Sequence, residues 1–145
     1  MKWCAAIVGA CLSFYCLATP VSAEVRIRSD GGGEVGSYLY KFALIRQSGQ
    51  KVIIDGPCLS ACTLLLAVIP RDRMCATERA NLGFHAARYV SDSGRMVMTS
   101  EGTRRVMAIY PPAVQRWIKR KGGLNGHMIY MNGNELAAHV PRCNG

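Results

Sequence analysis

The chain has 145 residues, and half of them are hydrophobic, which excludes an intrinsically disordered protein. This length is enough for one domain with its own core and is too short for two domains. The formal net charge of +9 comes from dispersed basic residues, densest over 116–121, without a nucleic-acid-binding motif. We therefore expect no nucleic-acid partner. The charge predicts weak attraction to anionic surfaces, and a solvated basic face is the plainer interpretation.

Residues 1–23 have the pattern of an export signal. Lys2 supplies a positive start, residues 3–17 are almost all apolar, and small residues lead up to Ala23. The apolar stretch is shorter than the roughly 20 residues of a membrane-spanning helix, and a proline follows it. We expect cleavage near Ala23 and a periplasmic or secreted single domain over residues 24–145.

Four of the seven cysteines lie beyond the expected signal. An even number of cysteines in an exported protein predicts disulfides, and four cysteines allow three pairings. The sequence has no C-x-x-C pair and no histidine at ligand spacing, so we expect no metal, and nothing indicates an organic cofactor. The four are Cys58, Cys62, Cys75 and Cys143.

The first half of this domain alternates between predicted strands and helices. Apolar residues at alternating positions predict strands, and apolar residues at helical spacing predict helices. The order strand, helix, strand, helix favours a parallel sheet with crossover helices. The segments are a strand over 24–29, a helix from Val35 to the stop signal Ser48-Gly49, a strand over 51–54, and a buried helix over 61–69 that ends at Pro70.

The second half shows weaker signals. Residues 81–85 predict a short strand, and 95–99 alternate weakly. Two helices are expected over 103–109 and 112–121, divided at Pro111, with Trp117 and Ile118 facing the core. A short helix over 134–139 ends the predicted elements.

Ser60 stands where a strand, a tight turn and a buried helix follow one another. Backbone N–H groups are unpaired at a helix N-terminus, and the helix dipole favours negative charge there. This suits a nucleophile whose attack creates an oxyanion. Serine is also a common N-cap residue, and this segment alone favours the cap.

Two further features bear on Ser60. Gly31-Gly32-Gly33 follows the preceding strand, and parallel strands end at one sheet edge, so the glycine turn is expected beside Ser60. Its N–H groups would offer part of an oxyanion hole. His85 closes the strand over 81–85 and is placed to act as a base. By itself, His85 is also typical of a partly buried structural histidine.

Several motifs together resemble one family. Residues 27–32 are similar to a strand followed by a Ser-Pro-Gly-Gly turn, Gly56 lies four residues before Ser60, and His85 lies 25 residues after it. Residues 73–75 resemble the start of that family's next strand, and residues 131–136 resemble the entry to its last helix. Their order and spacing resemble the ClpP/crotonase superfamily, within it a branch of small exported proteins.

The resemblance implies an α/β, ClpP/crotonase-like fold: a short parallel sheet with βαβ crossovers, truncated at its N-terminal side. It implies a serine hydrolase, peptidase- or esterase-like, with Ser60 as nucleophile and His85 as base. The N–H of Ala61, with that of Gly31 or Gly32, would form the oxyanion hole. The substrate would be a peptide or an ester. The alternative is a catalytically inactive binding or structural module of the same fold.

The sequence departs from the family where the triad aspartate is expected, because Met128 occupies that position. Without an acid to hold the imidazole, a triad enzyme loses several orders of magnitude in rate. Asp30 also replaces the proline of the glycine turn. The missing N-terminal unit predicts an open sheet edge, which a homo-oligomer would cover. Other groups considered as acid or base are Asp55, Asp92, Glu101, Lys119, Lys121 and His127.

The expected fold reduces the number of possible cysteine pairings. A helix from Ser60 to Ile69 is about 15 Å long, whereas disulfide partners need α-carbons within roughly 7 Å. Cys75 lies beyond that helix, so pairing it with Cys58 or Cys62 is disfavoured. This favours Cys58–Cys62 with Cys75–Cys143, and buried free thiols remain the alternative.

Overall fold

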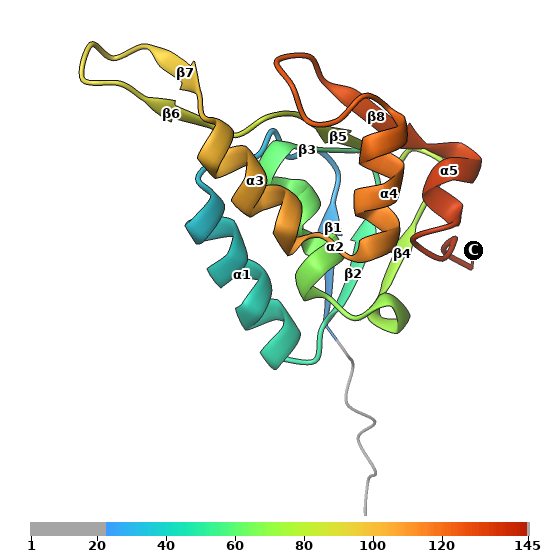
Figure 1. Ribbon diagram of the computed structural model, residues 1–145. Coiled ribbons are helices and arrows are strands. Elements are labelled where there is room, and N and C mark those ends of the chain that lie inside the picture. The colour runs from blue at the N-terminus through green and yellow to red at the C-terminus, as the bar shows by residue number, and fades with distance from the viewer. Residues whose placement is uncertain (1–22, 145) are drawn as a thin grey trace, which may run out of the picture.

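The computed structural model describes residues 23–144, so all of the expected signal segment 1–23 except its last residue lies outside the described residues. The chain folds as a mixed α/β protein (Figure 1). In chain order the elements are β1 (Glu24–Ile27), α1 (Val35–Gln47), β2 (Lys51–Ile54), β3 (Pro57–Leu59), the 3-10 helix η1 (Ser60–Leu64), α2 (Leu65–Val68), the 3-10 helix η2 (Arg71–Arg73), β4 (Met74–Ala76), β5 (Asn81–Phe84), β6 (Arg88–Val90), β7 (Met96–Met98), α3 (Ser100–Ile109), α4 (Pro112–Arg120), β8 (Ile129–Asn132) and α5 (Gly133–Ala137).

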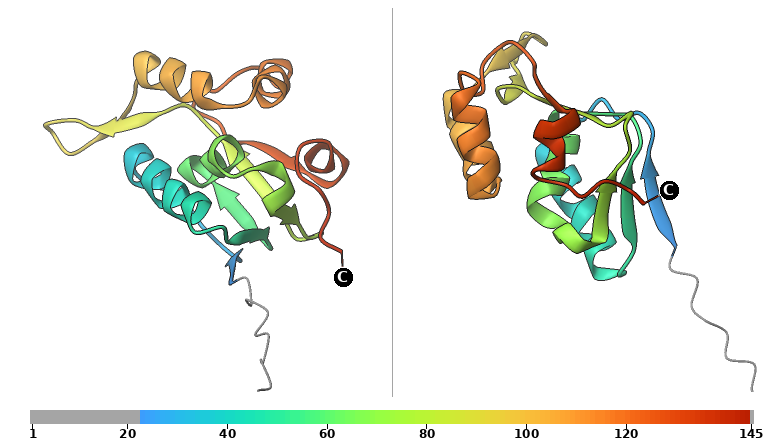
Figure 2. Two further views of the ribbon diagram at one scale, coloured as in Figure 1. Left: turned by 90° about the horizontal axis from the view of Figure 1, so that it is seen from below. Right: turned by 90° about the vertical axis from the view of Figure 1, so that its right-hand side faces the viewer.

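The first sheet is parallel, in the order β1-β2-β4. The helix α1 crosses over between β1 and β2, which confirms the predicted βαβ unit. Val52 and Ile54 of the central strand are fully buried. In side view the first sheet, the pair α1 and α2, and the pair α3 and α4 follow one another as three layers (Figure 2).

A second sheet, in the order β3-β5-β8, was not expected. β3 and β5 are parallel, but β8 is antiparallel to β5, so the prediction of one short parallel sheet holds for only part of the fold. The chain passes between the sheets at Gly56, where a Cβ would lie 2.0 Å from the carbonyl oxygen of Arg28. The tight turn predicted at 55–57 therefore leads directly into a strand.

Two helices differ from their predicted bounds by three residues or more. The segment over 61–69 begins as the 3-10 helix η1 at Ser60 and becomes α-helical only at Leu65. The helix expected from Thr103 begins at Ser100, because the Thr99 side chain accepts a hydrogen bond from the Gly102 N–H and caps it.

Aromatic side chains fill the core between the second sheet and the helices α3 and α4. Phe84 of β5 lies edge-on to Tyr110, with ring centroids 5.6 Å apart, and 5.4 Å from Trp117 of α4. Trp117 and Ile118 are buried, as their spacing predicts. α4 ends at Gly122-Gly123, both with positive φ, in a turn closed by a hydrogen bond from the Gly123 N–H to the Ile118 carbonyl.

Both disulfides follow the favoured pairing. Cys58–Cys62 spans four residues with α-carbons 5.3 Å apart, and Cys75–Cys143 ties β4 to the C-terminal segment with α-carbons 4.9 Å apart. Disulfides persist in oxidising compartments, so the pair fits a protein outside the reducing cytoplasm. Among residues 23–144, no helix is both long and apolar enough to cross a membrane.

Candidate functional site

The backbone of Ser60 adopts an uncommon conformation. Its φ is +55°, and Ser60 is the one non-glycine residue with positive φ among residues 23–144. Such a conformation costs of order 1–3 kcal/mol and persists only where surrounding structure enforces it. Ser60 lies at the sharp junction where the strand β3 meets η1. A strand-to-helix turn also presents the nucleophilic serine in some hydrolases. The N-cap of η1 is Leu59, without a side-chain hydrogen bond, so the interpretation of Ser60 as a cap is wrong.

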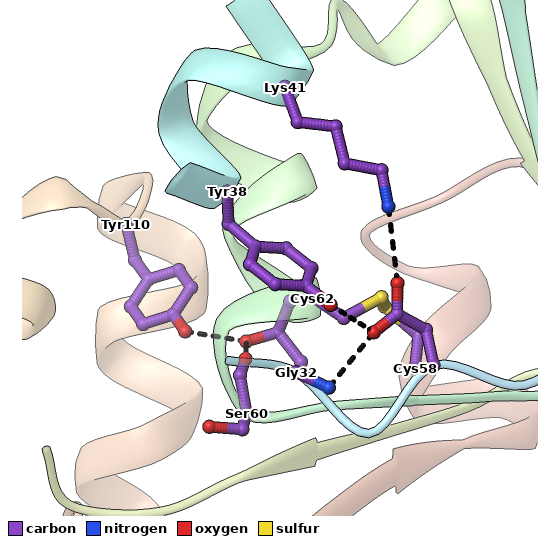
Figure 3. Close-up of a disulfide and its surroundings, with 9 residues drawn as sticks. Gly32, Tyr38, Lys41, Cys58, Ser60, Cys62 and Tyr110 are labelled. Atoms are coloured by element: carbon purple, nitrogen blue, oxygen red, sulfur yellow. Dashed lines mark hydrogen bonds and ion pairs between the residues drawn. A yellow bond between two sulfur atoms is a disulfide. The ribbon is translucent and has the colours of Figure 1, made fainter. Parts of the chain in front are cut away.

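Contacts on both sides fix this turn (Figure 3). The Cys58–Cys62 disulfide closes around Ser60. The Thr63 hydroxyl donates to the Ser60 carbonyl oxygen at 2.6 Å and lies 2.6 Å from the Tyr110 hydroxyl. Burial raises the pKa of Tyr110 to about 12, against a smaller lowering by Thr63, so Tyr110 stays protonated and donates to Thr63.

The glycine turn lies directly against Ser60, as predicted. Gly32 has a φ of +82°, and a Cβ there would lie 2.6 Å from the Ser60 Cβ and 2.8 Å from the Ala61 nitrogen. Gly31, by contrast, has open space around its Cβ position. Only a glycine at position 32 allows the two turns to meet.

A carboxylate already occupies the Gly32 N–H. Asp30 Oδ1 accepts from this N–H at 2.9 Å and from the Tyr38 hydroxyl at 2.5 Å, and Oδ2 lies 3.4 Å from Lys41 Nζ (Figure 3). Burial opposes ionisation of Asp30, but these partners hold its pKa below the usual value. In this arrangement Gly32 cannot donate to an oxyanion while Asp30 keeps its N–H.

Ser60 and His85 line the same pocket, which has a volume of about 630 Å³. Ala61 also lines it, whereas Gly31 and Gly32 do not; the glycine turn contributes Gly33 instead. The pocket lies between the start of α1, η1, the segment after β5, the β6–β7 hairpin and α3. The structure therefore brings three of the five predicted catalytic and oxyanion-hole residues to one cavity.

His85 is held by a backbone group rather than by an acid. Its Nδ1 lies 2.6 Å from the carbonyl oxygen of Ala86. A carbonyl only accepts, so Nδ1 carries the proton in the neutral ring and Nε2 is left as the acceptor. Within residues 23–144, no hydrogen bond joins His85 to Ser60. The last pair of the β5–β8 ladder is Phe84 with Ile129, so Met128 is the residue just before β8, and its sulfur lies against Gly83, 2.9 Å from where a Cβ would be.

The other acids considered for the triad are engaged elsewhere. Asp55 is buried and accepts hydrogen bonds from Arg79, Thr77 and Arg26, and these lower its pKa to about 2. Glu101 pairs with two arginines of its own helix.

The remaining groups considered as acid or base do not line the pocket: Asp92, Lys119, Lys121 and His127. Lys121 pairs with Glu135 at 2.7 Å.

The sequence does not indicate the supporting residues Thr63 and Tyr110. They lie 47 residues apart, and neither belongs to a recognised motif. A comparison with protein-family models finds no match for the chain, and no curated protein matches it.

Proposed function

We propose that the protein is an exported, ClpP/crotonase-like serine hydrolase of peptidase or esterase type, acting in the periplasm or after secretion. The observation that carries this proposal is the left-handed backbone of Ser60 on the wall of a pocket that His85 also lines. Backbone strain of this kind clusters at active sites, and the disulfide and Thr63 maintain it here.

The chemistry uses the two side chains in sequence. Ser60 Oγ attacks the substrate carbonyl carbon while its proton passes to His85 Nε2. The carbonyl oxygen becomes an oxyanion beside the Ala61 N–H, which has no acceptor within the first turn of η1. The tetrahedral intermediate then collapses, and the leaving alcohol or amine takes the proton from His85. Water, activated by the same Nε2, hydrolyses the acyl-enzyme and restores both groups.

In this mechanism the Ala86 carbonyl performs part of the work of the absent acid. It fixes the tautomer and the orientation of the His85 ring. A neutral carbonyl stabilises the imidazolium less than a carboxylate does, so we expect slow turnover. A full oxyanion hole additionally requires the Asp30 carboxylate to release the Gly32 N–H.

The test is labelling of the oxidised, signal-free protein by a fluorophosphonate probe. We expect labelling of the wild type, and its loss in Ser60→Ala and His85→Ala. Ser93→Ala, an exposed serine in the hairpin turn, is the matched control and should label normally. A folded wild type without labelling, checked by circular dichroism, would contradict the proposal.

The second candidate is an inactive module of the same fold. Met128 at the position that the resemblance assigns to the triad acid, and the occupied Gly32 N–H, favour it. β1 is the outer strand of the first sheet, so pairing of this edge in a homo-oligomer remains a proposal that light scattering can test. Weak binding to anionic surfaces through Arg116, Lys119 and Arg120, all exposed, is tested by vesicle binding at low and high salt.

A further inference from the structure

The pocket extends well beyond the Ser60 turn, and most of its wall is apolar. One side is the face of α3, and the other is the β6–β7 hairpin, which projects from the body of the molecule (Figures 1 and 2). Three side chains that line the hairpin side are more than half exposed: Tyr89, Val90 and Met96. The aliphatic lining residues elsewhere are Val35, Leu64, Val106 and Ile109.

The backbone along this wall has no free groups to pair with a peptide at Ala86 and Ala87. The Ala86 N–H donates to the Asn125 carbonyl at 2.8 Å, and the Ala87 N–H donates to Thr103 Oγ1 at 3.0 Å. The Ala87 carbonyl accepts from Thr99 N, and the Ala86 carbonyl is held by the imidazole. A peptide that docks as an added strand needs free backbone groups, and on this wall the outer edge of β6 supplies them, because its sheet has only two strands. A hydrocarbon chain needs no such groups, and the displacement experiment below tests the peptide as the rival occupant.

The charge at the pocket favours an anion. The Glu34 carboxylate accepts from the N–H groups of its own helix at Gly36 and Ser37, and Arg105 shares Glu101 with Arg104, so that cluster keeps one positive charge. Arg88 donates only to the neutral Gly126 carbonyl, at 3.0 Å, and has no acidic partner within residues 23–144. Of the two arginines that line the pocket, Arg88 is therefore the one without a carboxylate partner.

We propose that this groove binds the hydrocarbon chain of an anionic, single-chain acyl ester, with the anionic group at Arg88. This names the substrate class of the hydrolase proposed above and rests on that function. The chain lies between α3 and the hairpin, and the ester carbonyl reaches Ser60. Attack then proceeds with the bond changes already described, releasing a fatty acid and an alcohol.

Binding is tested separately from catalysis, in the Ser60→Ala protein with decanoate as the probe in calorimetry. We expect saturable binding with a negative heat-capacity change. Val106→Trp should weaken the binding of decanoate about tenfold or more, because the larger side chain fills the groove. Ala108→Trp, exposed on the same helix and outside the pocket, should not. Equal affinity in both variants would place decanoate elsewhere and overturn the proposal.

The role of Arg88 is tested by its charge. Arg88→Gln should lower the affinity for decanoate about tenfold, which is the effect of losing one charge-assisted hydrogen bond. Uncharged decanol should bind the variant and the parent equally. Arg95→Gln, in the same hairpin and outside the pocket, is the control. Equal loss of decanoate and decanol would show a steric effect and overturn the anion assignment.

The outcomes separate the two proposals. Decanoate binding without fluorophosphonate labelling leaves the acyl site standing and refutes the hydrolase. Labelling without decanoate binding refutes the acyl site alone. In the active protein, nitrophenyl decanoate should be cleaved with a higher kcat/KM than nitrophenyl acetate, and displacement of decanoate by an apolar peptide would favour a peptide site instead.

Discussion

Ser60 and His85 face the same pocket, yet the structure supports them very differently. Ser60 lies within a disulfide, receives the Thr63 hydroxyl on its carbonyl, and has Gly32 packed against its Cβ. His85 is half-buried and makes one hydrogen bond, to the carbonyl of its own neighbour. The Ser60 turn is therefore held from several sides, whereas the His85 ring is held by one contact.

In the proposed hydrolase, this difference places the weak point at His85. The contacts that hold the positive φ of Ser60 are present, and Met128 stands at the position where the resemblance puts the acid that would hold the histidine. If the protein is a hydrolase, its rate is limited by the base. If it is an inactive module, the rigid serine turn serves only binding. The predictions below separate these cases.

The largest effect is expected at the contact between the two turns. Gly32→Ala places a methyl group 2.5 Å from the Leu59 carbonyl oxygen at a φ that disfavours side chains. A displacement of about 1 Å at Ser60 can cost about 100-fold in rate, so labelling should fall by at least that factor. Gly31→Ala, with open space, is the control. Equal labelling of the two variants would contradict the close approach.

Installing a carboxylate at position 128 should have the next largest effect. If Met128 holds the position of the triad acid, as the resemblance implies, Met128→Asp should raise the labelling rate about tenfold by stabilising the His85 imidazolium. Met128→Leu is the control for altered packing and should leave the rate unchanged. If the carboxylate has no effect in a folded protein, Met128 does not occupy the position of the family acid.

A smaller loss is expected from the support behind Ser60. Tyr110→Phe removes the donor to Thr63 and should lower the labelling rate about fivefold, equivalent to roughly 1 kcal/mol for one hydrogen bond. Tyr40→Phe, exposed on α1, should change nothing. Thr63→Ser keeps the hydroxyl and should retain most of the rate, whereas Thr63→Val should not. Equal rates in the serine and valine variants would show that the hydroxyl is not involved.

Local patterns predicted much of this architecture and part of the site. The βαβ unit follows from apolar spacing, and the meeting of the glycine turn with Ser60 follows from the shared edge of parallel strands. The second sheet could not be predicted in this way, because β3 has three residues and pairs with β5, which pairs in turn with β8 near the end of the chain.

The same limit applies within the site. The Asp30 carboxylate on Gly32 N–H depends on a local turn geometry that spacing does not determine. The Tyr110–Thr63 contact depends on where α3 ends relative to η1. The first is a local contact within one turn, and the second is a tertiary contact between residues 47 positions apart; the spacing of apolar residues specifies neither.

The smallest effect on activity is expected at Asp55, which was a candidate acid and is committed to Arg79, Thr77 and Arg26. Its pKa is about 2 in the folded protein, held there first by Arg79, against about 3.9 in an unfolded chain. Because the folded value is the lower one, the ionised carboxylate stabilises the fold above pH of about 4, and this contribution is lost as the pH falls toward about 2.

Asp55→Asn should therefore lower the free energy of unfolding at neutral pH and flatten its dependence on pH across that acid window, while labelling of the folded variant stays unchanged. Chemical denaturation at a series of pH values measures the first effect, and Asp92→Asn, exposed in the hairpin turn, is the control. Loss of labelling in folded Asp55→Asn would mean that this carboxylate supports His85 after all. Asp55, which follows β2 of the first sheet, would then supply the support that His85 otherwise lacks. The contrast between the Ser60 and His85 sides of the pocket would disappear.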